Sequence, residues 1–144
     1  NIRKTISAYS LEKYVVLHGE MNGKELNQLY NNCDMAICSL GSHRKDIFLS
    51  SELKSREYLA KGIPFVYSGV IDVFGVSGID FAYQCPADES PVEIEKVLSF
   101  YKDLLKREDV SKLTDRIRAY AERMIDMKEV MRPVAEYFAS NADE

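Results

Sequence analysis

The sequence predicts an α/β fold with three layers, in which helices cover both faces of a mostly parallel sheet. Short runs rich in β-branched and aromatic residues alternate along the chain with longer segments whose apolar residues recur at helical spacing. The strand runs are apolar on both sides, as strands buried between two helical layers need to be. The chain has 144 residues, which suits a domain with its own hydrophobic core. We therefore expect residues 1–144 to form a single domain.

The predicted strands are short, and residues that interrupt extended structure bound several of them. Gly19 ends the first strand and Pro86 follows the last. Pro64 begins the third, at a position where a strand tolerates proline. The predicted strands are 14–19, 35–40, 64–68 and 81–85.

The predicted helices carry recognisable end signals. Ser50 and Ser51 are favourable N-caps for the second helix, and Gly62 suits the cap at its carboxyl end. Pro133 lies inside the last and longest helix, so we expect a kink or break near Arg132. The predicted helices are 24–33, 50–61, 91–107 and 111–140, which gives the domain long C-terminal helices.

Composition argues against several classes of function. The net charge is −4 and the isoelectric point about 5.3, whereas proteins that bind nucleic acid or anionic lipid usually present a basic surface. We expect no nucleic-acid partner. No apolar run approaches the roughly 20 residues that span a membrane, so we expect no transmembrane segment. Three cysteines without a C-x-x-C pair, and only two histidines, predict reduced thiols, a cytoplasmic location and no metal site.

The pattern of elements predicts a ligand site at one edge of the sheet. An open parallel sheet binds ligands at the carboxyl ends of its strands. One loop at that edge holds Gly19 and Glu20, and another, 41–49, leads into the helix at Ser50. The first amides of a helix and its dipole attract a phosphate, and the hydroxyls of Ser50 and Ser51 would add hydrogen-bond donors.

Charged side chains near that helix start complete the predicted site. The basic run 43–45 precedes the helix. One face of that helix is expected to carry Ser50, Lys54, Glu57 and Lys61. A phosphate at the helix start, an ammonium one turn in and a carboxylate two turns in make a nucleotide-diphosphate site, in which the carboxylate accepts the ribose hydroxyls. Simpler interpretations stay open. Lys54 and Glu57 can be a solvated helix pair, the basic run plain surface, and Ser50 an N-cap alone.

The run 51–66, S-E-L-K-S-R-E-Y-L-A-K-G-I-P-F-V, resembles a signature of the C-terminal domain of group 1 glycosyltransferases, which have the GT-B fold. That signature reads roughly S-x-L-K-x-x-E-Y-L-A-x-G-x-P-hydrophobic-V. The stretch upstream is similar as well, with a glycine after a hydrophobic run at Gly19. The segment from Glu25 to Ser39 then contains an E-L pair, a tyrosine and a run that reads D-hydrophobic-x-hydrophobic-x-S. The resemblance covers 14–68.

This resemblance implies an enzyme in which two Rossmann-like domains face a cleft. The chain would be a fragment of it, the half that binds a nucleotide-sugar donor, and its partner would be the missing N-terminal acceptor domain. Glu57 would contact the ribose hydroxyls. The segment Leu49, Ser50 and Ser51 would face the diphosphate, and Lys54 would offset the charge of the leaving nucleotide. The donor would be a UDP, GDP or ADP sugar, and neither a metal nor another cofactor would be strictly required.

One difference from the family pattern bears on activity. Many retaining members carry a second glutamate eight residues before the one that matches Glu57, and Leu49 stands at that position here. Because the acceptor site would lie in the other domain, we expect this part alone to bind the donor without turnover, and no residue is assigned a catalytic role. Two alternatives stay open: a non-catalytic α/β binding module, as in a degenerate transferase scaffold, and a GT-B-type nucleotide-sugar epimerase.

Overall fold

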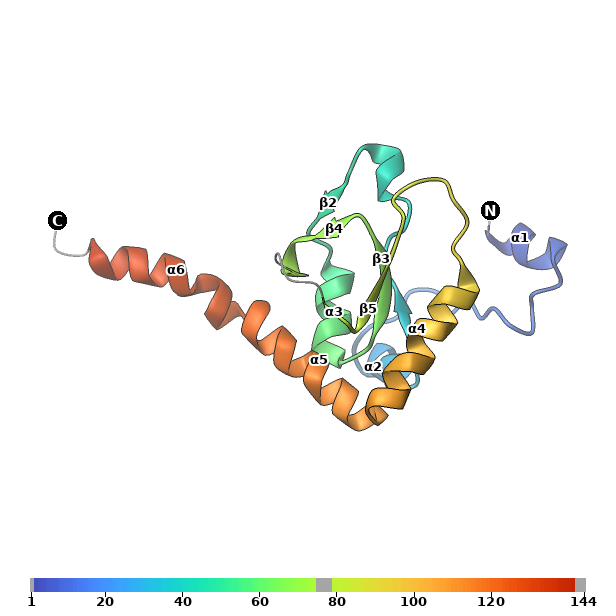
Figure 1. Cartoon of the computed structure of the whole chain (residues 1–144). Helices are drawn as coiled ribbons and strands as arrows, with labels where there is room; N and C mark the ends of the chain where they lie inside the picture. The colour runs from blue at the N-terminus through green and yellow to red at the C-terminus, as the bar shows by residue number, and fades with distance from the viewer. Residues whose placement is uncertain (1, 75–78, 142–144) are drawn as a thin grey trace. The chain divides into compact units, whose positions relative to one another are not determined.

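The computed structural model describes residues 2–74 and 79–141, which Figure 1 traces from blue to red. By its internal contacts the chain divides into two compact units, 1–32 and 33–144. The N-terminal unit holds two helices, α1 (Ile2–Ala8) and α2 (Gly23–Asn31). The second of these confirms the first predicted helix. That the whole chain works as one donor-binding domain stays a prediction.

The segment between these two helices corrects the first predicted strand. Residues 14–19 are a loop, in which the backbone N–H groups of Tyr14 and Val15 both donate to the carbonyl of Leu11 at 2.9 Å. These amides close a turn and do not join a strand ladder. Tyr14 and Val16 are 82% and 69% exposed. The prediction is wrong because a β-rich run becomes a strand only where a neighbouring strand pairs with it.

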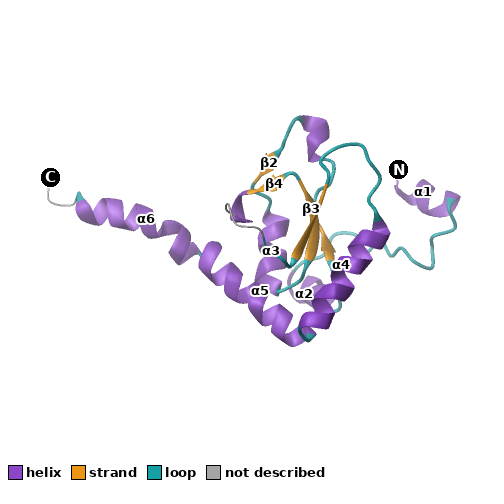
Figure 2. Cartoon of the chain, in the orientation of Figure 1, coloured by secondary structure: helices purple, strands orange, loops and turns teal. Residues whose placement is uncertain are grey.

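The C-terminal unit alternates strands with helices, which confirms an α/β class with parallel strand pairing (Figure 2). In chain order its elements are β1 (Ala36–Ile37), a 3₁₀ helix (Ser42–Lys45), β2 (Leu49–Ser50), α3 (Leu53–Lys61), β3 (Phe65–Ser68), β4 (Val70–Ile71), a second 3₁₀ helix (Asp72–Phe74), β5 (Ala82–Cys85), α4 (Ile94–Arg107), α5 (Val110–Met124) and α6 (Met127–Ser140).

Within the described residues, β1, β3 and β5 form a three-stranded sheet with β3 in the middle, and both of its pairings are parallel. Ala36 pairs with Phe65, and Phe65 in turn pairs with Ala82. The three strands confirm the last three predicted runs, although β1 is only two residues long. Because the strands are parallel and in register, their carboxyl ends lie at the same edge of the sheet.

Helices contact the sheet on both of its faces. Phe65 of β3 is fully buried, and its ring packs against Tyr58 of α3 at a centroid distance of 5.7 Å. Val66, the next residue, points to the opposite face and pairs with Tyr83, whose ring lies 5.5 Å from that of Phe100 in α4. The helices α3 and α4 therefore pack on opposite faces of the sheet.

The helix predicted at 50–61 begins three residues late, which corrects both predicted N-caps. Leu49 and Ser50 form β2, which pairs in parallel with β4, and the N-cap of α3 is Glu52. The N–H of Val70 donates to the carbonyl of Phe48 at 2.7 Å, so the pairing already begins before β2. Backbone bonds to β4 hold this segment extended, and a local preference of serine for N-caps does not overcome them.

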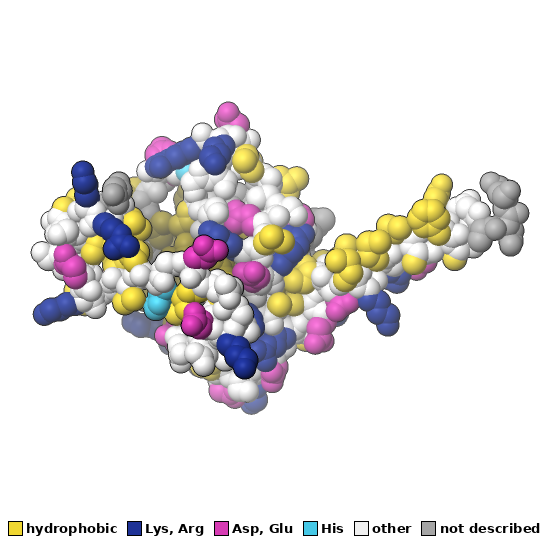
Figure 3. All heavy atoms as spheres, turned by 180° about the vertical axis from the view of Figure 1, so that it is seen from behind, with side chains coloured by type: hydrophobic (Ala, Val, Ile, Leu, Met, Phe, Trp, Pro, Cys, Tyr) yellow, Lys and Arg dark blue, Asp and Glu magenta, His cyan; other side chains and the backbone are white. Residues whose placement is uncertain are grey.

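The C-terminal helix predicted at 111–140 is two helices, so the expected single break near Arg132 is misplaced. α5 and α6 meet at Ile125 and Asp126, and the Asp126 side chain caps α6 by accepting the N–H of Lys128 at 2.8 Å. Pro133 lies inside α6. The apolar side chains of α6 are exposed and form a strip along it in Figure 3; they are Met127, Val130, Met131, Val134, Tyr137 and Phe138.

The junction of α3 with β3 depends on Gly62. This residue ends α3 with a φ of +74°, in the left-handed region that favours glycine. Its N–H donates to the carbonyl of Leu59 at 3.0 Å, and the N–H of Ile63 donates to that of Tyr58 at 2.9 Å. A Cβ atom at this position would lie 2.6 Å from the carbonyl oxygen of Thr114. Glycine is therefore what lets α5 pack so closely against the end of α3.

Replacing Gly62 by alanine should destabilise the C-terminal unit by roughly 2–5 kcal/mol. The left-handed backbone costs a non-glycine residue about 1–2 kcal/mol, and overpacking against α5 adds about 1–3 kcal/mol. Urea denaturation followed by circular dichroism measures this loss. The control is Gly19→Ala in the N-terminal unit, which has the same kind of backbone, with a φ of +76°, but no described atom within 4 Å of an added Cβ; it should leave the stability of the C-terminal unit unchanged. Equal losses for the two variants would contradict the close contact with α5.

Candidate functional site

Hydrogen bonds join the loops at the carboxyl edge of the sheet. Ser68, the last residue of β3, donates its hydroxyl to the carbonyl of Leu40 at 3.0 Å. The N–H of Ser39 donates to Oε2 of Glu52 at 3.3 Å, and Glu52 is the N-cap of α3. The end of β3 and the start of α3 are thus both held against the loop that follows β1.

A buried tyrosine fixes α3 beside the end of β1, and a buried cysteine follows that strand. The Tyr58 hydroxyl donates to the carbonyl of Ile37 at 3.2 Å, and burial raises the pKa of Tyr58 to about 12. Burial also raises the pKa of the Cys38 thiol to about 12; the charge of Glu52 adds to this rise and that of Lys54 opposes it. Cys38 is therefore a protonated thiol in the core and not a nucleophile. The charges of Glu52 and Lys54 both lie within electrostatic reach of the end of β1.

The structure brings together only part of the predicted site. Lys54 and Glu57 lie one turn apart on α3 and both are exposed, while Lys61 is half-buried on the last turn. Gly19 and Glu20 belong to the N-terminal unit, so their share in the site stays a prediction.

Leu49, Ser50 and Ser51 lie before α3 and not on it, which corrects the predicted helix face. Leu49 is 65% exposed in β2, and Ser50 is its half-buried neighbour. Ser51 is exposed, and the carboxylate of Asp72 pairs with Arg56 of α3 at 2.8 Å. The Arg56 hydrogen bond is the main reason that the pKa of Asp72 is lowered, and Ser51 contributes to it.

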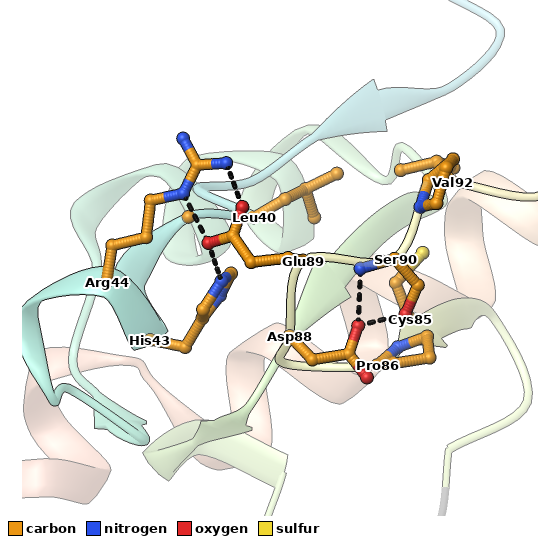
Figure 4. A pocket seen from close by; sticks show the side chains of 11 residues that line it. Leu40, His43, Arg44, Cys85, Pro86, Asp88, Glu89, Ser90 and Val92 are labelled. Atoms are coloured by element: carbon orange, nitrogen blue, oxygen red, sulfur yellow. Dashed lines mark hydrogen bonds and ion pairs between the residues drawn. The ribbon is translucent and has the colours of Figure 1, made fainter.

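A cavity of about 260 Å³ opens at the same edge of the sheet (Figure 4). Its walls come from the loop that follows β1 and from the loop that follows β5, two segments that the sheet brings together. Apolar parts of the wall are supplied by Leu40, Cys85, Pro86, Pro91 and Val92, and polar ones by His43, Arg44, Asp88, Glu89 and Ser90.

Glu89 joins the two loops of the cavity. Its carboxylate accepts two hydrogen bonds from Arg44, from Nε at 2.7 Å and from Nη2 at 2.5 Å. The Nε2 atom of His43 lies 3.1 Å from Oε1 of the same carboxylate. The Arg44 hydrogen bonds, followed by that of His43, lower the pKa of Glu89 to about 2. Since an ionised carboxylate only accepts hydrogen bonds, the His43 Nε2 must carry the proton. Nδ1 of His43 is buried without a hydrogen-bond partner in the described structure.

Asp88 is the second acid of the cavity. Its Oδ1 accepts both the backbone N–H of Ser90, at 2.7 Å, and the Ser90 hydroxyl. The hydrogen bond from the Ser90 hydroxyl, followed by that from its backbone N–H, lowers the pKa of Asp88. Both acids of the cavity are therefore ionised at neutral pH.

Sequence reasoning missed this pair of acids. The run 87–90 is a short polar loop between Pro86 and Pro91, and it directly follows the predicted strand 81–85. The rule that ligands bind at the carboxyl ends of parallel strands applies to this loop as well as to the two loops considered. That rule was the one signal that could have found Asp88 and Glu89.

Comparison of the chain with protein-family models, curated proteins and solved structures finds no match in any of the three. Over the residues that the structure covers, no three side chains of the metal-binding types gather closely enough to hold an ion. None of the described helices combines the length and apolarity that a membrane crossing requires. The function of the edge is therefore argued from its own chemistry.

In an NMR titration of side-chain carboxyls, Glu89 should ionise with a pKa of about 2, and Arg44→Gln should raise this pKa toward the ordinary value of 4.5. Because the pKa is lowered in the folded chain, the link between the two loops is complete above about pH 4.5 and is lost as the pH falls toward 2. Arg118→Gln removes an exposed cation from α5 and should leave the pKa of Glu89 unchanged. A Glu89 pKa that does not respond to Arg44→Gln would contradict the ion pair.

Proposed function

We propose that the chain is the donor-binding half of a GT-B-type glycosyltransferase and that it binds a nucleotide sugar at the carboxyl edge of its parallel sheet. One observation carries this proposal. α3 begins beside the end of β1, where Ser39 donates to Glu52, and it presents Lys54 and Glu57 on its exposed side. This is the position at which open α/β sheets bind nucleotides.

The diphosphate would lie at the start of α3. The first amides of this helix have no partner within it, and its dipole favours an anion there. Glu52 places a carboxylate at the same end, so the site needs a compensating cation. Lys54 would be that cation, because it lies in the first turn of α3. Lys54 would also offset the charge that develops on the departing nucleotide.

The ribose would lie beside Glu57. Three residues along a helix advance it by about 4.5 Å, which separates the Glu57 carboxylate from Lys54 in the direction that leads away from the helix start. An exposed carboxylate accepts two vicinal hydroxyls, the role that an acidic residue has in dinucleotide-binding folds. The UDP, GDP or ADP part of the donor would thus run along α3.

In this proposal the fold is the Rossmann-like half of a GT-B enzyme. Its support is the parallel β1–α3–β3 crossover, a second parallel pairing to β5, and helices that contact both sheet faces. The acceptor would be bound by a further N-terminal domain. The proposal requires neither a metal nor a cofactor.

One observation favours the alternative of a non-catalytic binding module. Leu49 occupies the position of the second family glutamate, and it is exposed in β2 with its backbone paired to Val70. No carboxylate can act from that position, because leucine has none. A domain that binds the donor without supporting transfer would show the same features.

Isothermal titration of the chain with UDP, GDP and ADP tests the donor site. One nucleotide should bind selectively, and Glu57→Ala should weaken it by roughly 1–3 kcal/mol, because a hydrogen-bonding carboxylate is removed from the ribose. Glu95→Ala removes a carboxylate from the first turn of α4 and should have no effect. Nucleotide affinity that is absent, or unchanged in Glu57→Ala, would contradict the donor site.

A further inference from the structure

The turn that opens α2 carries an asparagine followed by a glycine, Asn22 and Gly23. In such a pair the asparagine side chain reacts readily with the next backbone nitrogen, because glycine has no Cβ atom to shield that nitrogen. We propose that this pair is a site of spontaneous deamidation, at which Asn22 becomes isoaspartate and aspartate. The chemistry of the pair is independent of the nucleotide site proposed above.

The reaction needs only the chain and water. The backbone nitrogen of Gly23 gives its proton to hydroxide and attacks Cγ of Asn22. The bond from Cγ to Nδ2 breaks, and ammonia leaves with a proton from water, which restores the hydroxide and closes a succinimide ring. Water then opens the ring. Opening at Cγ yields aspartate, whereas opening at the backbone carbonyl carbon yields isoaspartate, whose main chain runs through Cβ and Cγ. Nothing is oxidised or reduced.

The Asn22 side chain is exposed and is not held in place. Asn22 is the N-cap of α2, but its side chain makes no capping hydrogen bond, and no other described group bonds to it. Two other asparagines differ in this respect. The Asn32 amide donates to the carbonyl of Gln28 at 2.9 Å, and the Asn141 amide donates to that of Tyr137 at 2.7 Å. The amide of Asn22 can therefore turn toward the backbone without breaking a described bond.

The backbone nitrogen that attacks is free as well. Gly23 is the first residue of α2, so the helix leaves its N–H without a partner, and no described group outside the helix accepts it. By contrast, the nitrogen that would attack Asn31 is that of Asn32, which donates to the carbonyl of Leu29 at 3.1 Å. Gly23 also has no described atom within 4 Å of the place that a Cβ would take. Nothing in the described structure therefore shields its nitrogen.

The backbone at this turn can bring the two groups together. Asn22 is extended, with a ψ of 170°, and ring closure requires a rotation about this bond that carries the nitrogen of Gly23 toward Cγ. The hydrogen bond that this rotation strains runs from the N–H of Leu26 to the carbonyl of Asn22, and it is already long at 3.5 Å. Gly23 has a φ of +54°, which favours glycine at the position that makes the asparagine reactive.

The products change the charge of the chain more than its helices. Deamidation makes the formal net charge one unit more negative than −4, and the new carboxylate lies two residues after Glu20. It also lies at the start of α2, where the helix dipole favours a negative charge. The modified chain should therefore stay folded and separate from the parent chain by ion exchange.

Tryptic peptide mapping of the incubated full chain by mass spectrometry tests the site. Peptide 14–24 holds Asn22 as its one asparagine, and peptide 25–44 holds three others, which serve as the internal control. Peptide 14–24 should convert at least about tenfold faster, as a barrier lower by about 1.4 kcal/mol gives, and should resolve into isoaspartate and aspartate forms. Asn22→Gln should abolish the conversion, because the longer side chain closes a less favourable ring. Equal rates in the two peptides would overturn the proposal.

Two further measurements separate reaction at an open turn from its competitors. The folded chain should deamidate at a rate within about tenfold of that of the chain unfolded in guanidinium, because the turn opens without global unfolding; a slower rate would show that the fold protects Gly23, and would overturn the proposal. The rate should rise with pH, because the attacking nitrogen must lose its proton. A rate that rises in acid instead, with aspartate as the sole product, would mean direct hydrolysis of the side chain and would overturn ring closure.

Discussion

The parallel register of β1, β3 and β5 is the constraint on which the rest of the C-terminal unit depends. Because β3 pairs in parallel with both neighbours, the loops that follow all three strands emerge at one edge. The Ser68–Leu40 hydrogen bond and the Ser39–Glu52 hydrogen bond then hold those loops and the start of α3 together. An antiparallel neighbour would send its loop to the opposite edge, and neither the cavity nor the α3 site would form.

The start of α3 shows how a long-range pairing overrides a local signal. Two serines at 50 and 51 favour an N-cap, but the backbone of Leu49 and Ser50 finds strand partners in β4. The helix therefore begins at Leu53, and Glu52 takes the N-cap position. The consequence is electrostatic. A carboxylate replaces two hydroxyls at the helix end that was expected to receive a phosphate, which makes Lys54 more important to any anion site there.

Glu89 unites two loops that are far apart along the chain. Exposed ion pairs usually contribute little to stability, but this carboxylate takes two hydrogen bonds from one guanidinium and a third from His43. The arrangement fixes the orientation of the acid more than it stabilises the fold. The loop that follows β1 and the loop that follows β5 are therefore joined through one carboxylate.

Local patterns in the sequence determined the class of the fold and the position of two residues of the proposed site. Apolar spacing identified α2, α3, α4 and three of the four strands, and placed Lys54 and Glu57 on the exposed side of one helix, because helical and strand periodicity are set by residues close in sequence. Tertiary structure alone decided that 14–19 would be a loop, that β2 would pair with β4, and that Arg44 would meet Glu89, 45 residues further along. Each of these depends on which distant backbone or side chain lies alongside, and periodicity carries no information about that neighbour.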